Sequence, residues 1–382
     1  MNEVAHINGR VPFLDIKRVY REIEVEINKA VARVFQNGVF ILGPEVEAFE
    51  REWARFCRVN AAASTGNGTD ALELALIASG AARHGRGDEV ITTALTAGYT
   101  ALAIINAGAI PVFADIDPHT YLITPESIEA AITPRTRAIV PVHLYGQMAD
   151  MRAISELAKR HNLIVVEDAA QAHGAGSNHL RPGTHSTAAI FSFYPTKNLG
   201  AFGDGGAVVS NDEKLIEKIK ILRQGGHAQA ISGDLAGRNS RLDEFHASML
   251  RAKLNRLDEW NHRRRELASF YYEGLKETQL QLPCSKDDVS HVWHLYVVQH
   301  CERDRLRSHL AEKGIETKIH YSYLLHQQTL FRRPDQKPLP VAERVASRIL
   351  SLPLYPQLRL EEAQCVVDVI REFEEENTKQ TK

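Results

Sequence analysis

The strongest constraint on the fold is an alternation that runs from about residue 59 to residue 210. Short apolar segments of strand-like composition alternate there with amphipathic segments of helical periodicity. This alternation is typical of a parallel sheet whose strands are connected by helices on both of its faces. The expected strands lie at residues 59–64, 89–93, 110–114, 138–142, 163–167, 188–193 and 206–210. The sequence therefore predicts an α/β domain with a mostly parallel, seven-stranded sheet.

Helix caps between the expected strands support this interpretation. Thr124 precedes Pro125, and a proline is favourable at the first position of a helix. Asp150 precedes the periodic stretch 151–161 and can accept hydrogen bonds from its first free N–H groups. The caps and the periodicity therefore indicate the same helices.

The second half of the chain is organised differently. Residues 241–275 are helical in pattern and strongly charged, which predicts one long connecting helix. After Pro283 we expect a strand at 292–299, a helix at 303–313 ended by Gly314, a strand at 316–319 and two further helices. This order predicts a smaller C-terminal α+β domain. We expect a large domain at residues 1–255 and a small domain at residues 256–382.

Composition argues against several classes of protein. The 382 residues include 46 Lys and Arg against 48 Asp and Glu, so no basic excess favours nucleic acid or an anionic membrane. No stretch approaches the ~20 apolar residues that span a bilayer. The four cysteines lack C-x-x-C spacing, which argues against a metal site and a disulfide framework and favours buried thiols. We expect a cytoplasmic protein without a metal.

A glycine-rich turn, residues 64–70, joins the first expected strand to a helical run at 71–79. Free backbone N–H groups and the positive end of the helix dipole converge at such a turn, and glycines let an anion approach closely. The turn is therefore a candidate phosphate site. The alternative is an ordinary turn whose helix is capped by Thr69 or Asp70.

A carboxylate and an amine stand further along the expected sheet. Asp168 follows the strand at 163–167, at the edge where open α/β sheets bind ligands. Lys197 lies in a loop rich in small and turn-forming residues. Pyridoxal 5'-phosphate (PLP) requires an amine to form an imine with its aldehyde and a carboxylate to keep its ring nitrogen protonated. The pair therefore predicts a PLP enzyme, with Gln171 beside the phenolic oxygen and Ser192 near the phosphate.

Each of these residues also has a structural interpretation. Asp168 would cap a helix, Gln171 would be an ordinary polar helix residue, and Lys197 would be a solvated surface residue. Ser192 would merely end its strand. The glycines at 200–205 loosely resemble a dinucleotide-binding fingerprint, but they precede a strand instead of following one, which disfavours a nicotinamide enzyme.

The order and spacing of these motifs resemble the DegT-type nucleotide-sugar aminotransferases, which are fold-type I PLP enzymes with an aspartate aminotransferase-like fold. The resemblance covers nearly the whole chain, from residues 11–15 and 41–50 to residues 350–353. It implies an enzyme that transfers an amino group from L-glutamate to a keto-sugar linked to a nucleotide.

The resemblance also implies roles for individual residues. Lys197 resembles the Schiff-base lysine, which also moves protons, Asp168 the partner of the pyridinium, and Gln171 the neighbour of the cofactor hydroxyl. The phosphate ligands that it implies are Asn67, Gly68, Thr69 and Ser192. Asn239, in the run 237–244, matches an asparagine that reaches the phosphate of the neighbouring subunit, which implies a homodimer with two shared active sites.

The substrate is suggested by two runs, 143–147 and 169–175, which are more similar to family members acting on 3-keto-6-deoxy sugars of dTDP than to those acting at C4. Tyr194 and His173 are candidates for contacting the sugar or assisting proton transfer, with structural packing as the alternative. His320 and Tyr321 are further candidate substrate contacts.

The chain departs from the family pattern after Thr96. The family usually has an aromatic ring there that stacks on the cofactor, whereas this chain has Ala97, which makes Tyr99 the candidate for stacking. Three alternatives stay open: amination at C4, a sugar dehydratase of the same fold, and a non-catalytic regulator. Dehydratases typically replace the lysine by histidine, so Lys197 disfavours that activity, and intact Asp168, Lys197 and Asn239 disfavour a regulator.

Overall fold

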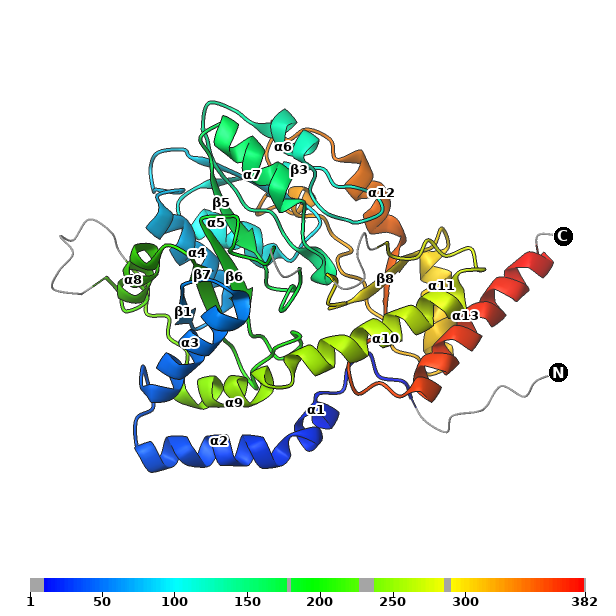
Figure 1. Ribbon diagram of the computed structural model, residues 1–382. Coiled ribbons are helices and arrows are strands. Elements are labelled where there is room, and N and C mark those ends of the chain that lie inside the picture. The colour runs from blue at the N-terminus through cyan, green and yellow to red at the C-terminus, as the bar shows by residue number, and fades with distance from the viewer. Residues whose placement is uncertain (1–9, 177–179, 227–236, 285–289, 381–382) are drawn as a thin grey trace.

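One central sheet of seven strands organises the fold (Figure 1). The computed structural model describes residues 10–176, 180–226, 237–284 and 290–380. The strands are β1 (Ala61–Thr65), β2 (Glu89–Thr93), β3 (Ile110–Ala114), β4 (Thr136–Ile139), β5 (Ile164–Asp168), β6 (Ala188–Ser192) and β7 (Gly206–Ser210). Their order is β1-β7-β6-β5-β4-β2-β3, with β7 antiparallel to both neighbours and the other pairs parallel. The predicted mostly parallel, seven-stranded sheet is confirmed.

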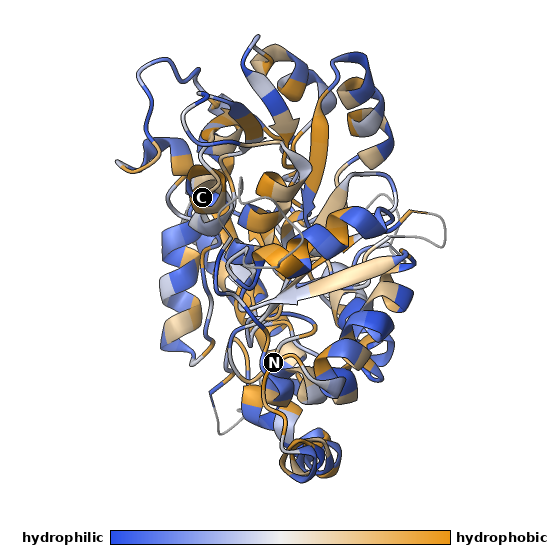
Figure 2. Cartoon of the chain, turned by 90° about the vertical axis from the view of Figure 1, so that its left-hand side faces the viewer, coloured by the Kyte–Doolittle hydropathy of each residue, from blue (hydrophilic) through white to orange (hydrophobic). Residues whose placement is uncertain are grey.

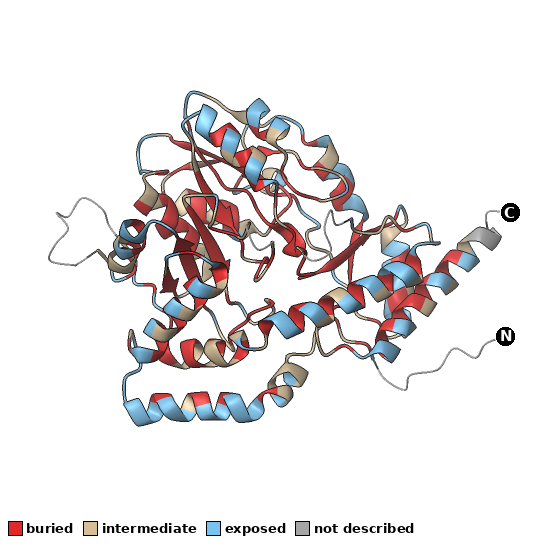
Figure 3. Cartoon of the chain, in the orientation of Figure 1, coloured by how far each residue is buried: buried red, intermediate tan, exposed pale blue. Residues whose placement is uncertain are grey.

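Helices cover both faces of this sheet. One face carries α4 (Gly68–Ser79), α5 (Gly98–Asn106) and α8 (Glu213–Leu222), and the other carries α3 (Pro44–Cys57), α6 (Pro125–Ala131), α7 (Met151–Arg160) and α9 (Glu244–Leu254). Successive strand residues such as Val165 and Val166 therefore belong to cores on opposite faces. Because both faces are covered, most strand residues are buried, with Arg137 on β4 as an exposed exception (Figures 2 and 3).

The predicted caps are present. The Thr124 hydroxyl accepts a hydrogen bond from the N–H of Ser127 at 3.2 Å, in a reciprocal capping box that opens α6. The Asp150 carboxylate accepts one from the N–H of Ala153 at 3.2 Å and opens α7. The sequence pattern thus located these helix starts to the residue.

The C-terminal part forms a second, smaller α+β unit with its own apolar core. It contains α10 (Leu257–Leu275), α11 (Arg303–Glu312), α12 (Pro340–Arg348), α13 (Leu360–Gln380) and the short helix η2 (Leu325–Gln327). Strand β8 (Tyr296–Gln299) pairs with β9 (Ile349–Leu352) in an antiparallel ribbon. The three predicted helices of this region are confirmed, and the strand predicted at 292–299 is shorter than expected.

Two expectations for this half are wrong. The single connecting helix at 241–275 is two helices, α9 and α10, separated at Asn255 and Arg256. Residues 316–319 do not form a strand, because only Lys318 pairs with Ser351 in an isolated bridge before the chain turns toward the large sheet. Strand β8 pairs with β9, and the paired residues, from Gln299 with Ile349 to Tyr296 with Leu352, are far apart in the sequence.

The N-terminal segment crosses to the smaller unit. Val11 pairs with Ile315 and packs in the C-terminal core, after which come α1 (Ile16–Glu22) and α2 (Glu24–Asn37), and α2 runs beneath α9 (Figure 1). The far half of α10 packs in the same C-terminal core. We propose that the boundary between the large and small domains lies between residues 255 and 256. The N-terminal segment contacts both domains, since Val11 packs in the C-terminal core and α2 packs on α9.

The four cysteines differ in their burial. Cys57 is buried, but Cys284 and Cys301 are exposed, so the expectation of buried thiols is wrong for these two. None of the helices in the described ranges is both long and apolar enough to cross a membrane. Within the same ranges no three His, Cys, Asp or Glu side chains are grouped so that they could hold a metal ion.

Candidate active site

Asp168 ends β5 at the carboxyl edge of the sheet and is almost fully buried. Its Oδ2 accepts a hydrogen bond from the hydroxyl of Thr100 at 2.7 Å, and its Oδ1 accepts one from the N–H of Ala170 at 3.1 Å. Residues 169–176 form turns, so Asp168 does not cap a helix. Two donors on different segments therefore fix the orientation of this carboxylate.

Thr100 is a site residue that sequence reasoning missed. It lies in the first turn of α5, which follows β2, and its side chain is buried. A threonine near a helix start carries no signal of this role in the sequence. Only the topology, which brings the start of α5 beside the end of β5, makes it a partner of Asp168.

Lys197 is half-buried in the loop after β6, and its N–H donates to the Tyr194 carbonyl at 2.9 Å. Burial lowers the pKa of its amine to about 8, and the charge of Asp168 opposes part of that shift. The Asp168 carboxylate is thus close enough to act on Lys197 electrostatically. Lys197 is therefore not a freely solvated surface lysine, and about one tenth of its amine is neutral at pH 7.

The start of α4 is a candidate anion cradle. Asn67 caps the helix, since its Oδ1 accepts from the Asp70 N–H at 2.9 Å and its carbonyl accepts from the Ala71 N–H at 3.1 Å. The alternative caps, Thr69 and Asp70, are therefore wrong. The N–H groups of Gly68 and Thr69 are left without an intrahelical acceptor and are available to an anion.

Gly68 also brings Ser192 to this cradle. A Cβ at Gly68 would lie 2.8 Å from the Cβ of Ser192, closer than two carbon atoms can pack. Only a glycine therefore allows the end of β6 to lie against the first turn of α4. The Ser192 hydroxyl stands beside the free N–H groups as a result.

Gln171 is buried in a turn, so it is not the ordinary helix residue of the structural interpretation. Its Oε1 accepts from the Tyr145 N–H at 2.7 Å, which orients the amide so that Nε2 donates to the Tyr321 hydroxyl at 3.0 Å. One N–H of Gln171 remains for a ligand. Tyr145, in the short helix η1 (Leu144–Gly146), is a second residue whose role sequence reasoning missed.

Tyr321 and His320 come from the small domain to this place. Burial raises the pKa of Tyr321 to about 12. The hydrogen bond with Gln171 opposes this rise, and the negative charge of Asp168 adds to it. The Tyr321 hydroxyl therefore stays protonated and can donate to a ligand. His320 is held by a 2.9 Å hydrogen bond between its Nδ1 and the Ser351 hydroxyl, and burial lowers its pKa to about 4.

His173 is fully buried. Its ring packs against Trp53, Phe191 and Phe193, at centroid separations of 5.9, 5.3 and 5.8 Å. Its Nε2 donates to the Ser192 carbonyl at 2.9 Å. Burial, with a contribution from the charge of Lys197, lowers its pKa to about 3, so the imidazole is neutral. The structure places His173 beneath the strand end that carries Ser192.

Three of the sequence-predicted site residues lie at the surface. Tyr99 and Tyr194 are 67% and 52% exposed, and Asn239 is exposed as well. Tyr99 is next to Thr100 on α5, and Tyr194 lies in the loop that leads to Lys197. These side chains are available to a ligand or a partner subunit.

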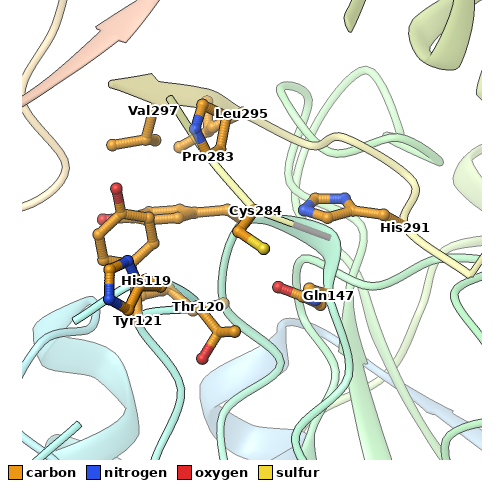
Figure 4. A pocket seen from close by; sticks show the side chains of 11 residues that line it. His119, Thr120, Tyr121, Gln147, Pro283, Cys284, His291, Leu295 and Val297 are labelled. Carbon is orange, nitrogen blue, oxygen red and sulfur yellow. The ribbon is translucent and has the colours of Figure 1, made fainter. Parts of the chain in front are cut away.

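A separate small pocket, with Tyr145 in its lining, lies between the large domain and the segment that leads into β8 (Figure 4). His119, Tyr121, Cys284 and His291 are among its lining side chains. Its volume of about 10 Å³ admits no more than about one water molecule. It is therefore too small for an amino acid or a sugar.

Residues 21–371 match the DegT/DnrJ/EryC1/StrS aminotransferase family. The chain is 47% identical to the dTDP-3-amino-3,4,6-trideoxy-alpha-D-glucose transaminase of Streptomyces venezuelae, over 96% of this chain and 97% of that protein. It is 45% identical to a pleiotropic regulatory protein of Geobacillus stearothermophilus, over 95% of this chain and 98% of that protein.

A solved structure confirms the predicted aspartate aminotransferase-like fold. The crystal structure of S. venezuelae DesV in complex with a ketimine intermediate superposes with a TM-score of 0.92, at 46% identity over 96% of this chain and 99% of that one. The match of the family over most of the sequence agrees with the match in three dimensions. The chain belongs to the DegT/DnrJ/EryC1/StrS aminotransferase family.

Proposed function

We propose that this family member is a cytoplasmic, homodimeric PLP enzyme that transfers an amino group from L-glutamate to a nucleotide-linked keto-sugar. A dTDP-3-keto-6-deoxyhexose is the first candidate acceptor. One observation carries the proposal: the Lys197 amine, with a pKa lowered to about 8, stands within electrostatic reach of the Asp168 carboxylate, which Thr100 holds in place.

The described residues fit three groups of PLP: its aldehyde, its ring nitrogen and its phosphate. Lys197 would bond the aldehyde, Asp168 would hold the ring nitrogen, and the N–H groups of Gly68 and Thr69 would bind the phosphate with the Ser192 hydroxyl. Asn67 shapes the cradle as the helix cap. When bound, PLP supplies an electron sink that stabilises negative charge on the substrate carbon that carries the amine.

The chain's own residues would handle protons and orientation. The Lys197 Nζ, neutral in part at pH 7 to 8, is suited to take and return a proton. The Tyr321 hydroxyl stays protonated and can donate, while Gln171 directs its remaining N–H into the site. We assign His173 a positioning role, since its low pKa and its bond to the Ser192 carbonyl suit a fixed neutral ring.

The substrate side is proposed from the positions of four side chains and from the relatives. Tyr194, His320 and Tyr321 offer hydroxyl and imidazole groups for a nucleotide-linked sugar, and Tyr99 is free to stack on the cofactor ring from the start of α5. The 47% identity to a dTDP-3-amino sugar transaminase supports dTDP and C3 amination. Asn239 is proposed to reach the phosphate of the partner subunit, which makes the sites shared.

A regulator without turnover is the second candidate function, because one relative is named a regulatory protein. A regulator without turnover would not require a lysine with a lowered pKa near an oriented carboxylate. The presence of Lys197, Asp168 and the cradle therefore favours catalysis.

The acceptor can be identified directly. Purified protein loaded with PLP is incubated with L-glutamate and a panel of dTDP- and UDP-linked 3-keto and 4-keto sugars, and the products are weighed by mass spectrometry. We expect an aminated product from the dTDP-linked 3-keto sugar and a fall in the visible absorbance of the bound cofactor on adding glutamate alone. Amination of only a 4-keto or UDP-linked sugar would correct the substrate, whereas no product and no spectral change would favour the regulator.

The pH dependence of cofactor uptake tests Lys197. Only the neutral amine attacks an aldehyde, and with a pKa of about 8 it is about one tenth neutral at pH 7 and about nine tenths neutral at pH 9. We expect the rate at which cofactor-free protein gains visible absorbance with PLP to rise roughly tenfold between these values and then level off. A rate that keeps rising toward pH 10.5, the ordinary lysine value, would contradict the lowered pKa.

A further inference from the structure

We propose that Asp70 is a positioning residue that links the two active sites of the dimer. It ties the phosphate cradle of its own subunit to the segment that presents Asn239 to the partner subunit. This inference rests on the proposed function, in which Asn239 acts on the neighbouring site.

Asp70 lies in the first turn of α4 and is 7% exposed. Three side chains donate to its carboxylate. Its Oδ2 accepts from the Ser240 hydroxyl at 2.6 Å and from Asn67 Nδ2 at 3.0 Å, and its Oδ1 accepts from Arg238 Nη1 at 3.0 Å. One partner belongs to the cradle, and the other two flank Asn239 in the sequence.

Ser240 closes the same link from the other side. Its buried hydroxyl donates to Asp70 and accepts from the N–H of Gly66 at 2.9 Å, so it joins both the carboxylate and the turn that forms the cradle. A hydroxyl that donates to a carboxylate makes a short, charge-assisted bond. The spacing between the cradle and the segment that carries Asn239 is therefore set by side chains as well as by the backbone.

The backbone around Asn239 is braced while its side chain is exposed. The Arg238 N–H donates to the Leu222 carbonyl at 2.8 Å, and the Ser240 N–H donates to the Arg223 carbonyl at 2.8 Å. These bonds hold the segment against the end of α8, and Asp70 fixes its position relative to the start of α4. A shift of the cradle in one subunit would thus move Asn239 at the site of the other.

Mixed dimers can isolate this effect. One subunit carries Lys197→Ala, so only the wild-type subunit can give the visible band of a cofactor bonded to lysine. The Lys197→Ala subunit then carries Asn239→Ala, Asp70→Asn, Ser240→Ala or no further change, and the PLP concentration for half of the full band is measured. Because the added changes lie in the silent subunit, they reach the observed site only through the partner contact.

We expect Asn239→Ala, Asp70→Asn and Ser240→Ala each to raise the half-saturating PLP concentration roughly fivefold. The matched control is Glu73→Gln, which removes the other ion pair of Arg238, at 2.8 Å, but keeps Ser240 bonded to Asp70, and it should change the value less than about twofold. Ser240→Ala tests the link even if Asp70→Asn does not fold, which thermal unfolding would reveal.

The outcomes separate the two proposals. If Asn239→Ala weakens the partner site but Asp70→Asn and Ser240→Ala do not, the link through Asp70 is wrong and the shared site stands. If Glu73→Gln weakens PLP binding at the partner site as much as Asp70→Asn does, the cause is the loss of negative charge on α4, and the link through Asp70 is also wrong. If Asn239→Ala itself has no effect, the proposed shared site fails first.

Discussion

Replacing Lys197 by alanine should lower the rate of transamination by roughly 10⁴-fold, which is the upper range for removing a group that transfers a proton. The absorbance band of the imine between PLP and the protein should also be lost, because Lys197 no longer supplies the amine that bonds the aldehyde. The cofactor should still be retained in part, since the cradle at Gly68 and Thr69 is unchanged. Turnover with L-glutamate and an absorbance spectrum of the dialysed protein measure both effects.

Lys253 provides the matched control for this variant. Lys253 is buried, its pKa is also strongly lowered, to about 7 by burial, and it lines the same cavity as Lys197. Its amine donates to the Gly200 carbonyl at 2.6 Å, and no charge of Asp168 contributes to its pKa. We expect Lys253→Met to keep the visible band and most of the turnover. If the band is lost in Lys253→Met and kept in Lys197→Ala, then Lys253 and not Lys197 bonds the cofactor, and the proposed role of Lys197 is wrong.

The parts of this protein that could be predicted from sequence are those set by local pattern. The seven strands were found because both faces of the sheet are covered, which leaves short apolar runs between polar turns. The caps at Thr124 and Asp150 were found because capping depends on three or four neighbouring residues. Local pattern failed at 316–319, where a single residue pairs with Ser351 and the rest of the segment leaves the sheet.

The candidate site divides in the same way. Lys197 and Asp168 carry their chemistry in their residue types and in their places after strands, so the sequence indicated both. Thr100 and Tyr321 contact Asp168 and Gln171 from 68 and 150 residues away. Those contacts depend on the strand order and on how the small domain packs against the large one. Neither can be predicted from a local sequence pattern. The cap of α4 is Asn67, whereas Thr69 and Asp70, two and three residues later, suit the position equally well by residue type.

Replacing Asp168 by asparagine should lower the rate of transamination by about 10²- to 10³-fold, as expected when an oriented charge is removed from an active site. The asparagine keeps the shape and can still accept the Thr100 hydrogen bond, but it cannot keep the ring nitrogen of PLP protonated. The electron sink is weakened while the site remains assembled. Turnover with L-glutamate and the keto-sugar, at saturating PLP, measures the loss.

Thr100→Val separates the charge of Asp168 from its orientation. Valine matches the shape of threonine but removes the donor at 2.7 Å from Oδ2, leaving the Ala170 N–H at 3.1 Å as the remaining bond to that carboxylate. The carboxylate keeps its charge, so we expect only about a fivefold loss of turnover, the value of one hydrogen bond. A loss in Thr100→Val equal to that in Asp168→Asn would mean that orientation outweighs charge. Full turnover in Asp168→Asn would show that this carboxylate does not hold the ring nitrogen, since the substitution removes its negative charge.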